Sequence, residues 1–276
     1  MEANYVVRRM VIYLILISMA VFSLTPLFVM SYQSLKTEHE FAFNPAGIVF
    51  KPSLENYIEA IDMLKRPLLN SLISCSLCTF LTIITCSFTG YLLASYSFKG
   101  RKFIFVTIAS GLGVPPQAYI IPLAMFAVYA NLYNNIIGLG IIFFLYSVTG
   151  GVLYFTNYYL TNVPKELIEA AHVDGCGILS TYVRVILPLS PTIIALVLSL
   201  NFTSWYNNLL WPLVLTAGPE SQTVPIIIAS TAGRTLVKWT LQMALSAIAS
   251  IPAMLIYLIA ARYISRGALA SLAMKR

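Results

Sequence analysis

Residues 103–164 form the longest charge-free stretch in this 276-residue chain and read FIFVTIASGLGVPPQAYIIPLAMFAVYANLYNNIIGLGIIFFLYSVTGGVLYFTNYYLTNVP. The stretch contains no Asp, Glu, Lys or Arg. A membrane-spanning helix needs about 20 mostly apolar residues. The stretch is therefore long enough for two such helices, separated by a turn that contains polar residues, proline or asparagine.

Similar charge-free runs recur along the chain, at residues 10–35, 67–98, 185–219 and 239–261, and each holds one span. Overall, 59% of the residues are hydrophobic and 10% are charged, whereas a soluble domain carries about 25% charged residues. The mean hydropathy is +0.82. These features predict an all-α integral membrane protein that forms a single transmembrane domain over residues 1–276. The six expected transmembrane helices are residues 10–31, 68–96, 103–127, 137–160, 187–210 and 240–262.

The basic residues predict the orientation of these spans. Arg8 and Arg9 precede an apolar stretch of about 21 residues that is too long for a signal peptide, so the first span is interpreted as a retained anchor. If the N-terminus is cytoplasmic, 11 of the 17 basic residues lie in inner segments and 6 in outer ones. We therefore expect a multi-pass protein of a bacterial or archaeal cell membrane, with both termini in the cytoplasm, rather than a nucleic-acid-binding surface.

Sites of covalent chemistry are not indicated by the sequence. Cys75 and Cys78 have metal-like spacing but lie within a span without a second pair of ligands, which favours helix packing over zinc binding. His39 and His172 fall on opposite sides of the membrane, and His172 is interpreted as incidental. No GxxxxGK[ST] motif is present to hold a nucleotide phosphate. We expect a non-catalytic chain with no metal and no cofactor of its own.

The stretch TNVPKELIEAAHVDGCGILSTYVRVILPLSP, residues 161–191, returns charge to the chain after the fourth span. Pro164 suits the first turn of a short helix, and Thr161 or Asn162 is available to cap it. Gly175 is expected to end this helix, because glycine enters the left-handed region without strain.

A second short segment, residues 178–186, is expected to join the fifth span rigidly at Leu187-Pro188. The resulting loop, residues 161–186, is suited to docking, because Ala170 and Ala171 allow close approach. From the residues alone, an ordinary interfacial helix explains the loop equally well.

The pattern EAA-xx-DG followed by I-LP resembles the cytoplasmic loop of the permeases of ABC importers, where the ATP-binding subunits dock. Further stretches at residues 34–37, 44–57, 114–123, 205–213 and 262–275 resemble the carbohydrate-type, maltose-like permeases in the same order. The docking residues expected from this resemblance and from the helix it contains are Glu166, Glu169, Ala170, Ala171, Asp174, Gly175, Leu187 and Pro188.

The resemblance implies the type I importer permease fold and a place in a heteromeric complex. A second homologous permease would complete the pathway, two ATP-binding subunits would bind ATP and Mg²⁺, and an extracytoplasmic solute-binding protein would deliver a sugar or oligosaccharide. An ion-coupled carrier or a passive channel for small polar solutes is the alternative, although the lack of charged residues deep in the spans speaks against ion coupling. A membrane scaffold is a third interpretation.

Aromatic and amide side chains near the end of the fifth span are candidates for the substrate pathway, because neutral sugars bind to ring faces and hydrogen-bonding groups. Their alternative roles are the interfacial aromatic belt and hydrogen bonding between helices. The candidate residues are Trp205, Tyr206, Asn207, Asn208 and Trp211.

Overall fold

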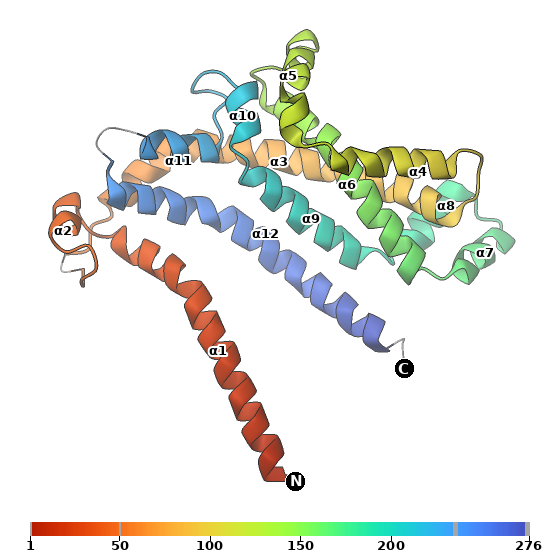
Figure 1. Cartoon of the computed structure of the whole chain (residues 1–276), viewed down its shortest axis with the longest axis horizontal. Coiled ribbons are helices and arrows are strands. Elements are labelled where there is room, and N and C mark those ends of the chain that lie inside the picture. Colours follow the sequence, from red (N-terminus) through yellow and green to blue (C-terminus); the bar gives the residue numbers. More distant parts are fainter. Residues whose placement is uncertain (1, 50, 234–236, 274–276) are drawn as a thin grey trace. The chain divides into compact units, whose positions relative to one another are not determined.

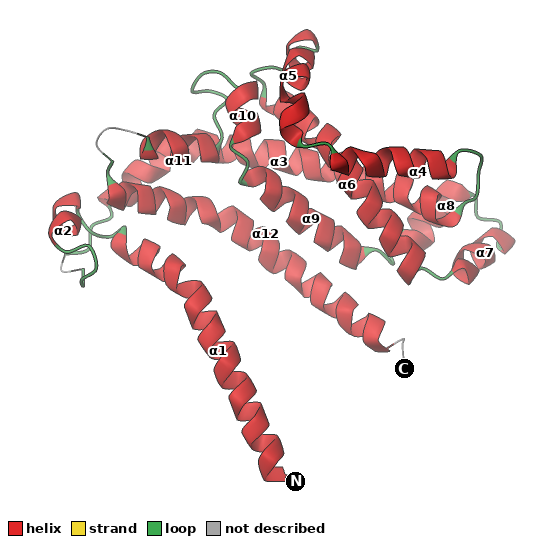
Figure 2. Cartoon of the chain, viewed as in Figure 1, coloured by secondary structure: helices red, strands yellow, loops and turns green. Residues whose placement is uncertain are grey.

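The computed structural model describes residues 2–49, 51–233 and 237–273, and in these ranges the chain forms helices and no strand (Figure 2). The all-α prediction is confirmed for this part of the chain. Arg234, Lys275 and Arg276, which contribute to the charge count, lie outside the described residues.

The helices follow one another through the chain with short connections (Figure 1). They are α1 (Glu2–Gln33), α2 (Glu38–Phe43), α3 (Glu55–Ser95), α4 (Arg101–Ser110), η1 (Gly111–Gly113), η2 (Pro116–Tyr119), α5 (Ile120–Tyr129), α6 (Ile136–Asn162), α7 (Lys165–Val173), α8 (Ile178–Thr181), η3 (Tyr182–Ile186), α9 (Pro191–Tyr206), α10 (Leu210–Leu215), α11 (Val224–Ala232) and α12 (Trp239–Ala273).

Four helices of the described chain, α1, α3, α6 and α12, are long and apolar enough to cross a membrane unbroken. Two bent pairs also qualify if each is counted as one span. One pair joins Arg101–Gly113 to Pro116–Tyr129 with a bend of 99°, and the other joins Ile178–Ile186 to Pro191–Tyr206 with a bend of 86°. The described residues thus contain four spans, or six if both bent pairs cross the membrane.

The expected span 103–127 is divided by the first of these bends. A 3₁₀ turn at Gly111–Gly113 is followed by an extended Val114 and by Pro115. Proline has no N–H to donate and disfavours the helical conformation at the residue before it, so Pro115 and Pro116 favour an interruption of the helix at this point. The turn between the third and fourth predicted spans does contain asparagines: Asn131 and Asn134 have φ angles of 56° and 54°.

The second bend corrects the prediction that residues 178–186 continue rigidly into the fifth span. The chain turns at residues 187–190, and α9 begins at Pro191 rather than at residue 187. Pro188 and Pro191 both lack a hydrogen-bond donor. Ser190 Oγ lies 2.5 Å from the carbonyl oxygen of Ile186, which the interrupted helix leaves without its usual partner.

The chain divides into two compact units, each of which is formed by two segments. One unit consists of Met1–Lys65 and Ile228–Ile251, and the other of Arg66–Ile227 and Pro252–Arg276. Helices α3, α11 and α12 contribute residues to both units. Helices α3 and α12 also extend beyond the predicted spans 68–96 and 240–262, because the helical backbone continues where the apolar composition ends.

The first unit is held together by hydrogen bonds between polar side chains and the backbone. The Asn56 side-chain amide donates to the carbonyl oxygens of Ser34 and Lys36, both at 2.8 Å. The backbone N–H of Thr240, in the first turn of α12, donates to Glu38 Oε1 at 2.9 Å. These contacts join the segment after α1 to the first turns of α3 and α12.

Lys36 lies at the centre of this arrangement and is fully buried. Its ammonium group donates to the carbonyl oxygens of Asn44, at 2.6 Å, and Gly47, at 2.8 Å. The Lys36 side chain therefore closes the loop that follows α2.

The second unit is built on close contact between α3 and α6. A Cβ atom added to Gly151 of α6 would lie 2.8 Å from Cys86 Sγ of α3, and one added to Gly140 would lie 2.9 Å from the carbonyl oxygen of Ser74. Small residues allow helix backbones to approach closely in a membrane. Gly140 and Gly151 therefore let α6 pack directly against α3.

Candidate functional site

The helix expected in the loop 161–186 is α7, Lys165–Val173, and it ends as predicted. Gly175 has a φ angle of +80°, and the N–H of the next residue, Cys176, donates to the Ala171 carbonyl oxygen at 2.9 Å. Pro164 occupies the N-cap without a side-chain cap. The predicted caps are wrong, since Thr161 Oγ1 and Asn162 Nδ2 instead donate to carbonyl oxygens of α6, four residues back along the chain.

The two faces of α7 differ in exposure. Ile168 and Ala171 are both 7% exposed, so Ala171 packs against its own chain and does not provide the expected close approach for another protein. Ala170 is exposed, and Val173 is 88% exposed. The exposed face combines acidic groups with apolar side chains, namely Glu166, Leu167, Glu169, Ala170, Val173 and Asp174.

His172 connects α7 to the end of α3 and is not incidental. Its Nδ1 lies 3.0 Å from the carbonyl oxygen of Cys176, and its Nε2 lies 3.0 Å from Tyr96 Oη. Because the carbonyl can only accept, Nδ1 carries the proton and Nε2 accepts from Tyr96 when the ring is neutral. Tyr96 Oη also lies 2.7 Å from Tyr91 Oη. A chain of hydrogen bonds thus runs from α3 to the turn at the end of α7.

The return segment, α8 followed by η3, is attached to α3 in a second way. Tyr182 Oη lies 2.5 Å from Ser87 Oγ, and both residues are buried. The helix η3 is a π-helix, Tyr182–Ile186, and it is followed directly by the bend at residues 187–190. Leu187 is half-buried at this bend, and Pro188 is exposed.

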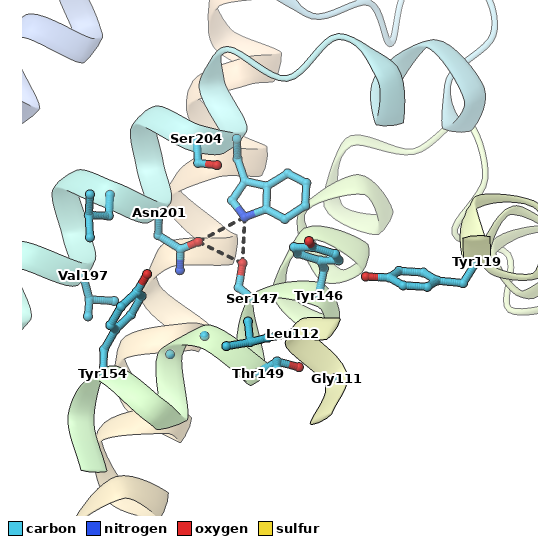
Figure 3. Close-up of a pocket in the computed structure, with 14 residues that line it drawn as sticks. Gly111, Leu112, Tyr119, Tyr146, Ser147, Thr149, Tyr154, Val197, Asn201 and Ser204 are labelled. Atoms are coloured by element: carbon cyan, nitrogen blue, oxygen red, sulfur yellow. Dashed lines mark hydrogen bonds between the residues drawn. The ribbon is translucent and has the colours of Figure 1, made fainter. Parts of the chain in front are cut away.

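A cavity of about 320 Å³ lies between α6, α9 and the α4–η2 connection (Figure 3). Aromatic rings and small polar groups line it, and no charged side chain does. The principal lining residues are Tyr119, Tyr146, Ser147, Tyr154, Asn201, Ser204 and Trp205.

Trp205 is fixed in the wall of this cavity by stacking and hydrogen bonds. Its ring stacks on Phe143, with centroids 4.2 Å apart, and meets Tyr146 edge to face at 5.4 Å. Its indole N–H points to Ser147 Oγ, at 2.7 Å, and Asn201 Oδ1, at 3.0 Å (Figure 3). The orientation of Trp205 is therefore determined before any ligand arrives.

Several polar groups of the lining have no partner within the described part of the chain. They are the side-chain NH₂ of Asn201 and the hydroxyl groups of Thr149, Tyr154 and Ser204. Tyr154 is 48% exposed, so its ring face is accessible. This combination of ring faces and free hydrogen-bonding groups can bind a neutral polar ligand.

Of the five substrate-pathway residues predicted from sequence, only Trp205 lines the cavity. Trp211 is 2% exposed, with its ring centroid 6.1 Å from that of Tyr119. Tyr206 is buried and stacks on Phe202. Asn207 is exposed at the end of α9. Asn208 Oδ1 accepts a hydrogen bond from the backbone N–H of Trp211 at 3.0 Å. The amide of Asn208 therefore stabilises the start of α10 within its own segment.

The lining residues on α6 and α9 follow a helical repeat. Val197, Asn201 and Trp205 are four residues apart along α9, and Tyr146, Gly150 and Tyr154 are four apart along α6. Such spacing places side chains on one face of a helix. The repeat was visible in the sequence, but nothing there indicated that these two faces meet.

The comparison with known families decides the identity of the fold. A family model described as the binding-protein-dependent transport system inner membrane component matches residues 87–269, more than half of the chain. The chain belongs to this family. The family resemblance predicted from the sequence is therefore confirmed, and the protein is a multi-pass permease subunit of a binding-protein-dependent importer.

Relatives of this permease are similar to it over almost their whole length. A protein named as a probable ABC transporter permease from Pyrococcus horikoshii is 35% identical, covering 94% of both chains. The permease of the arabinooligosaccharide transport system of Bacillus subtilis is 28% identical, covering 96% of this chain and 95% of that one. The permease of the trehalose/maltose transport system of Thermococcus litoralis is 29% identical, covering 95% of each.

The fold of the permease also matches a solved structure, that of a bacterial ABC transporter involved in the import of the acidic polysaccharide alginate. The TM-score is 0.78 at 18% sequence identity, and the match covers 93% of this chain and 96% of the other. The likeness shows that the two chains share a fold.

Proposed function

We propose that this permease forms half of the translocation pathway for a neutral sugar or oligosaccharide. In this proposal a second homologous permease supplies the other half, an extracytoplasmic binding protein delivers the sugar, and two separate subunits bind and hydrolyse ATP with Mg²⁺. The permease itself performs no catalysis and holds no cofactor. Its N- and C-termini lie in the cytoplasm of a bacterial or archaeal cell.

The observation that carries the sugar assignment is the cavity beside Trp205. Neutral sugars present flat C–H faces that pack on aromatic rings, and hydroxyl groups that exchange hydrogen bonds with amides and hydroxyls. The cavity offers both kinds of group and no charge. The names of the arabinooligosaccharide and trehalose/maltose relatives support the same class of substrate.

The exposed face of α7 supports docking of an ATP-binding subunit. Val173 and Leu167 are 88% and 42% exposed on a segment that also carries Glu166, Glu169 and Asp174, so the segment faces an environment other than lipid. Exposed apolar side chains rimmed by charged ones are typical of protein interfaces. In the proposal, Gly175 and the bend at Leu187-Pro188 fix the position of α7 relative to the spans and pass its movement on to them.

The test uses the whole importer, reconstituted in liposomes with its binding protein. Tyr154→Leu removes an accessible ring from the cavity, whereas Tyr129→Leu removes a ring that is 82% exposed on α5 and does not line it. We expect Tyr154→Leu to raise the sugar concentration needed for half-maximal transport about two- to tenfold, which is the range of one aromatic contact. Tyr129→Leu should leave it unchanged.

Two results would contradict the proposal. If both variants transport the sugar with the same half-saturating concentration, the cavity does not contact the sugar. Uptake that needs no ATP and follows an imposed ion gradient would favour the alternative, an ion-coupled carrier, and uptake down the solute gradient alone would favour a passive channel.

A further inference from the structure

A second cavity, of about 490 Å³, lies where α3 turns into α4 and meets one face of α6. Its volume falls in the range of about 300–1,000 Å³ that is usual for small-molecule sites. Its residues belong neither to the cavity beside Trp205 nor to the exposed face of α7. Most of its wall is apolar, formed by Leu93, Phe98, Phe103, Phe105 and Leu160.

Two basic residues open into this apolar cavity. Arg101 and Lys102 both line it, and no acidic residue does. Neither side chain forms an ion pair or a hydrogen bond within the ranges that the structure describes. Two cations without counter-charges beside apolar walls indicate a ligand that is both anionic and apolar.

The backbone and one buried hydroxyl group reinforce this preference for an anion. Arg101 begins α4, a helix of 10 residues whose N-cap, Gly100, has a φ angle of +90° and provides no side-chain cap. The start of a helix favours negative charge. Thr156 of α6 also lines the cavity and is 2% exposed, and its hydroxyl group has no hydrogen-bond partner among the described residues. An acceptor oxygen in the cavity would satisfy this hydroxyl.

The position of the cavity along the chain identifies the source of such a ligand. The turn at residues 96–100 joins the candidate span α3 to the bent pair that begins at Arg101. A basic turn between two apolar segments lies at the membrane surface, where phosphate groups and acyl chains meet. The rim is open to lipid, since Phe103 is 76% exposed and Leu160 is 51% exposed.

We propose that this cavity binds one anionic phospholipid. Arg101, Lys102 and the first turn of α4 hold its phosphate, the hydroxyl of Thr156 donates to a lipid oxygen below the phosphate, and the acyl chains lie along Phe103. The bound lipid would also stabilise the turn that begins at Tyr96, whose hydroxyl group bonds to His172 of α7. The lipid site is therefore next to the attachment of α7.

The experiment measures lipid binding to the full-length permease in detergent by native mass spectrometry. The probes are dioctanoyl phosphatidylglycerol, dioctanoyl phosphatidylcholine and inorganic phosphate. We expect one phosphatidylglycerol to bind at least about fivefold more tightly than phosphatidylcholine. Arg101→Gln and Lys102→Gln should each weaken its binding about fivefold, which corresponds to about 1 kcal/mol per basic residue at an anionic surface.

Two further variants separate a built site from general attraction to positive charge. Lys99→Gln removes one charge from the same turn but does not line the cavity, so it should change binding less than about twofold. Thr156→Val keeps both the shape and the charge of the cavity and should weaken binding about threefold or more, because it removes one hydrogen-bond donor. Thermal unfolding of each variant without lipid checks that the fold is unchanged.

Three results would overturn the proposal. In the first, Arg101→Gln and Thr156→Val bind phosphatidylglycerol as Lys99→Gln does. In the second, phosphatidylcholine or inorganic phosphate binds as tightly as phosphatidylglycerol. In the third, the ATP-binding subunits displace the lipid when they are added, which would assign the cavity to a protein contact instead.

Discussion

Replacing Gly175 with valine tests the turn that ends α7. Gly175 has a φ angle of +80°, and a Cβ atom added there would meet nothing within 4 Å, so the substitution changes only the backbone preference. A β-branched residue held in the left-handed region costs about 1–3 kcal/mol. If the turn opens instead, the N–H groups of Gly175 and Cys176 lose their bonds to the carbonyl oxygens of His172 (3.0 Å) and Ala171 (2.9 Å).

Losing these two hydrogen bonds costs about 2 kcal/mol, similar to the strain that opening would relieve. The native turn is therefore destabilised by about 2 kcal/mol along either route, which changes its population relative to open forms about 30-fold. The orientation of α7 then varies, while the spans are unchanged.

The assay is the number of ATP molecules hydrolysed per sugar transported by the importer in liposomes. Gly177→Val is the matched control, because Gly177 lies two residues away with φ −75° and ψ 173° and also has open space around it. We expect Gly175→Val to raise the ratio several-fold or to lose the ATP-binding subunits during purification, and Gly177→Val to do neither. Equal ratios in the two variants, with equal assembly, would refute the role assigned to this turn.

Three other predictions follow from the described contacts. Tyr96→Phe removes the hydroxyl group that bonds to His172. It should lower the free energy of unfolding by about 1 kcal/mol, measured by thermal unfolding, and raise the ATP-to-sugar ratio. No change in either measurement would show that this contact is incidental. Trp205→Phe keeps an aromatic ring but removes the N–H that donates to Ser147 and Asn201. We expect about 1 kcal/mol of destabilisation from the lost hydrogen bond, together with slower uptake. Uptake at the wild-type rate would show that the fixed indole is not needed. Lys36→Met leaves the carbonyl oxygens of Asn44 and Gly47 without their donor. Residues 37–49 should therefore be cut faster in limited proteolysis. Unchanged cleavage would show that the Lys36 ammonium group does not hold this loop.

The loop that contains α7 was predicted correctly where the signal is local. A left-handed glycine after a short run of helix formers is enough to end a helix, so Gly175 could be assigned from its neighbours alone. The role of His172 was not predictable in this way, because its partner Tyr96 is 76 residues away in the chain. The same limit applies to Ala171, whose burial depends on the segment that α7 packs against.

The cavity beside Trp205 shows the same division. Of the five substrate-pathway residues predicted from the sequence, Trp205 lines the cavity and the other four lie outside its lining. The hydrogen bond from Trp205 to Ser147 crosses between helices 58 residues apart. A sequence pattern shows which residues share a face of a helix, but it does not show which faces meet.

The sequence by itself determined that this chain lies in a membrane as a set of helices. Lipid offers no hydrogen bonds, so every span must be apolar in composition and helical in backbone, and both requirements are read from consecutive residues. Only the tertiary structure decided the bends of 99° and 86°, the lining of the two cavities and the attachment of α7 to α3. Prolines locate the two breaks, but the linings of the cavities and the attachment of α7 depend on contacts between residues far apart in the chain, which no local pattern specifies.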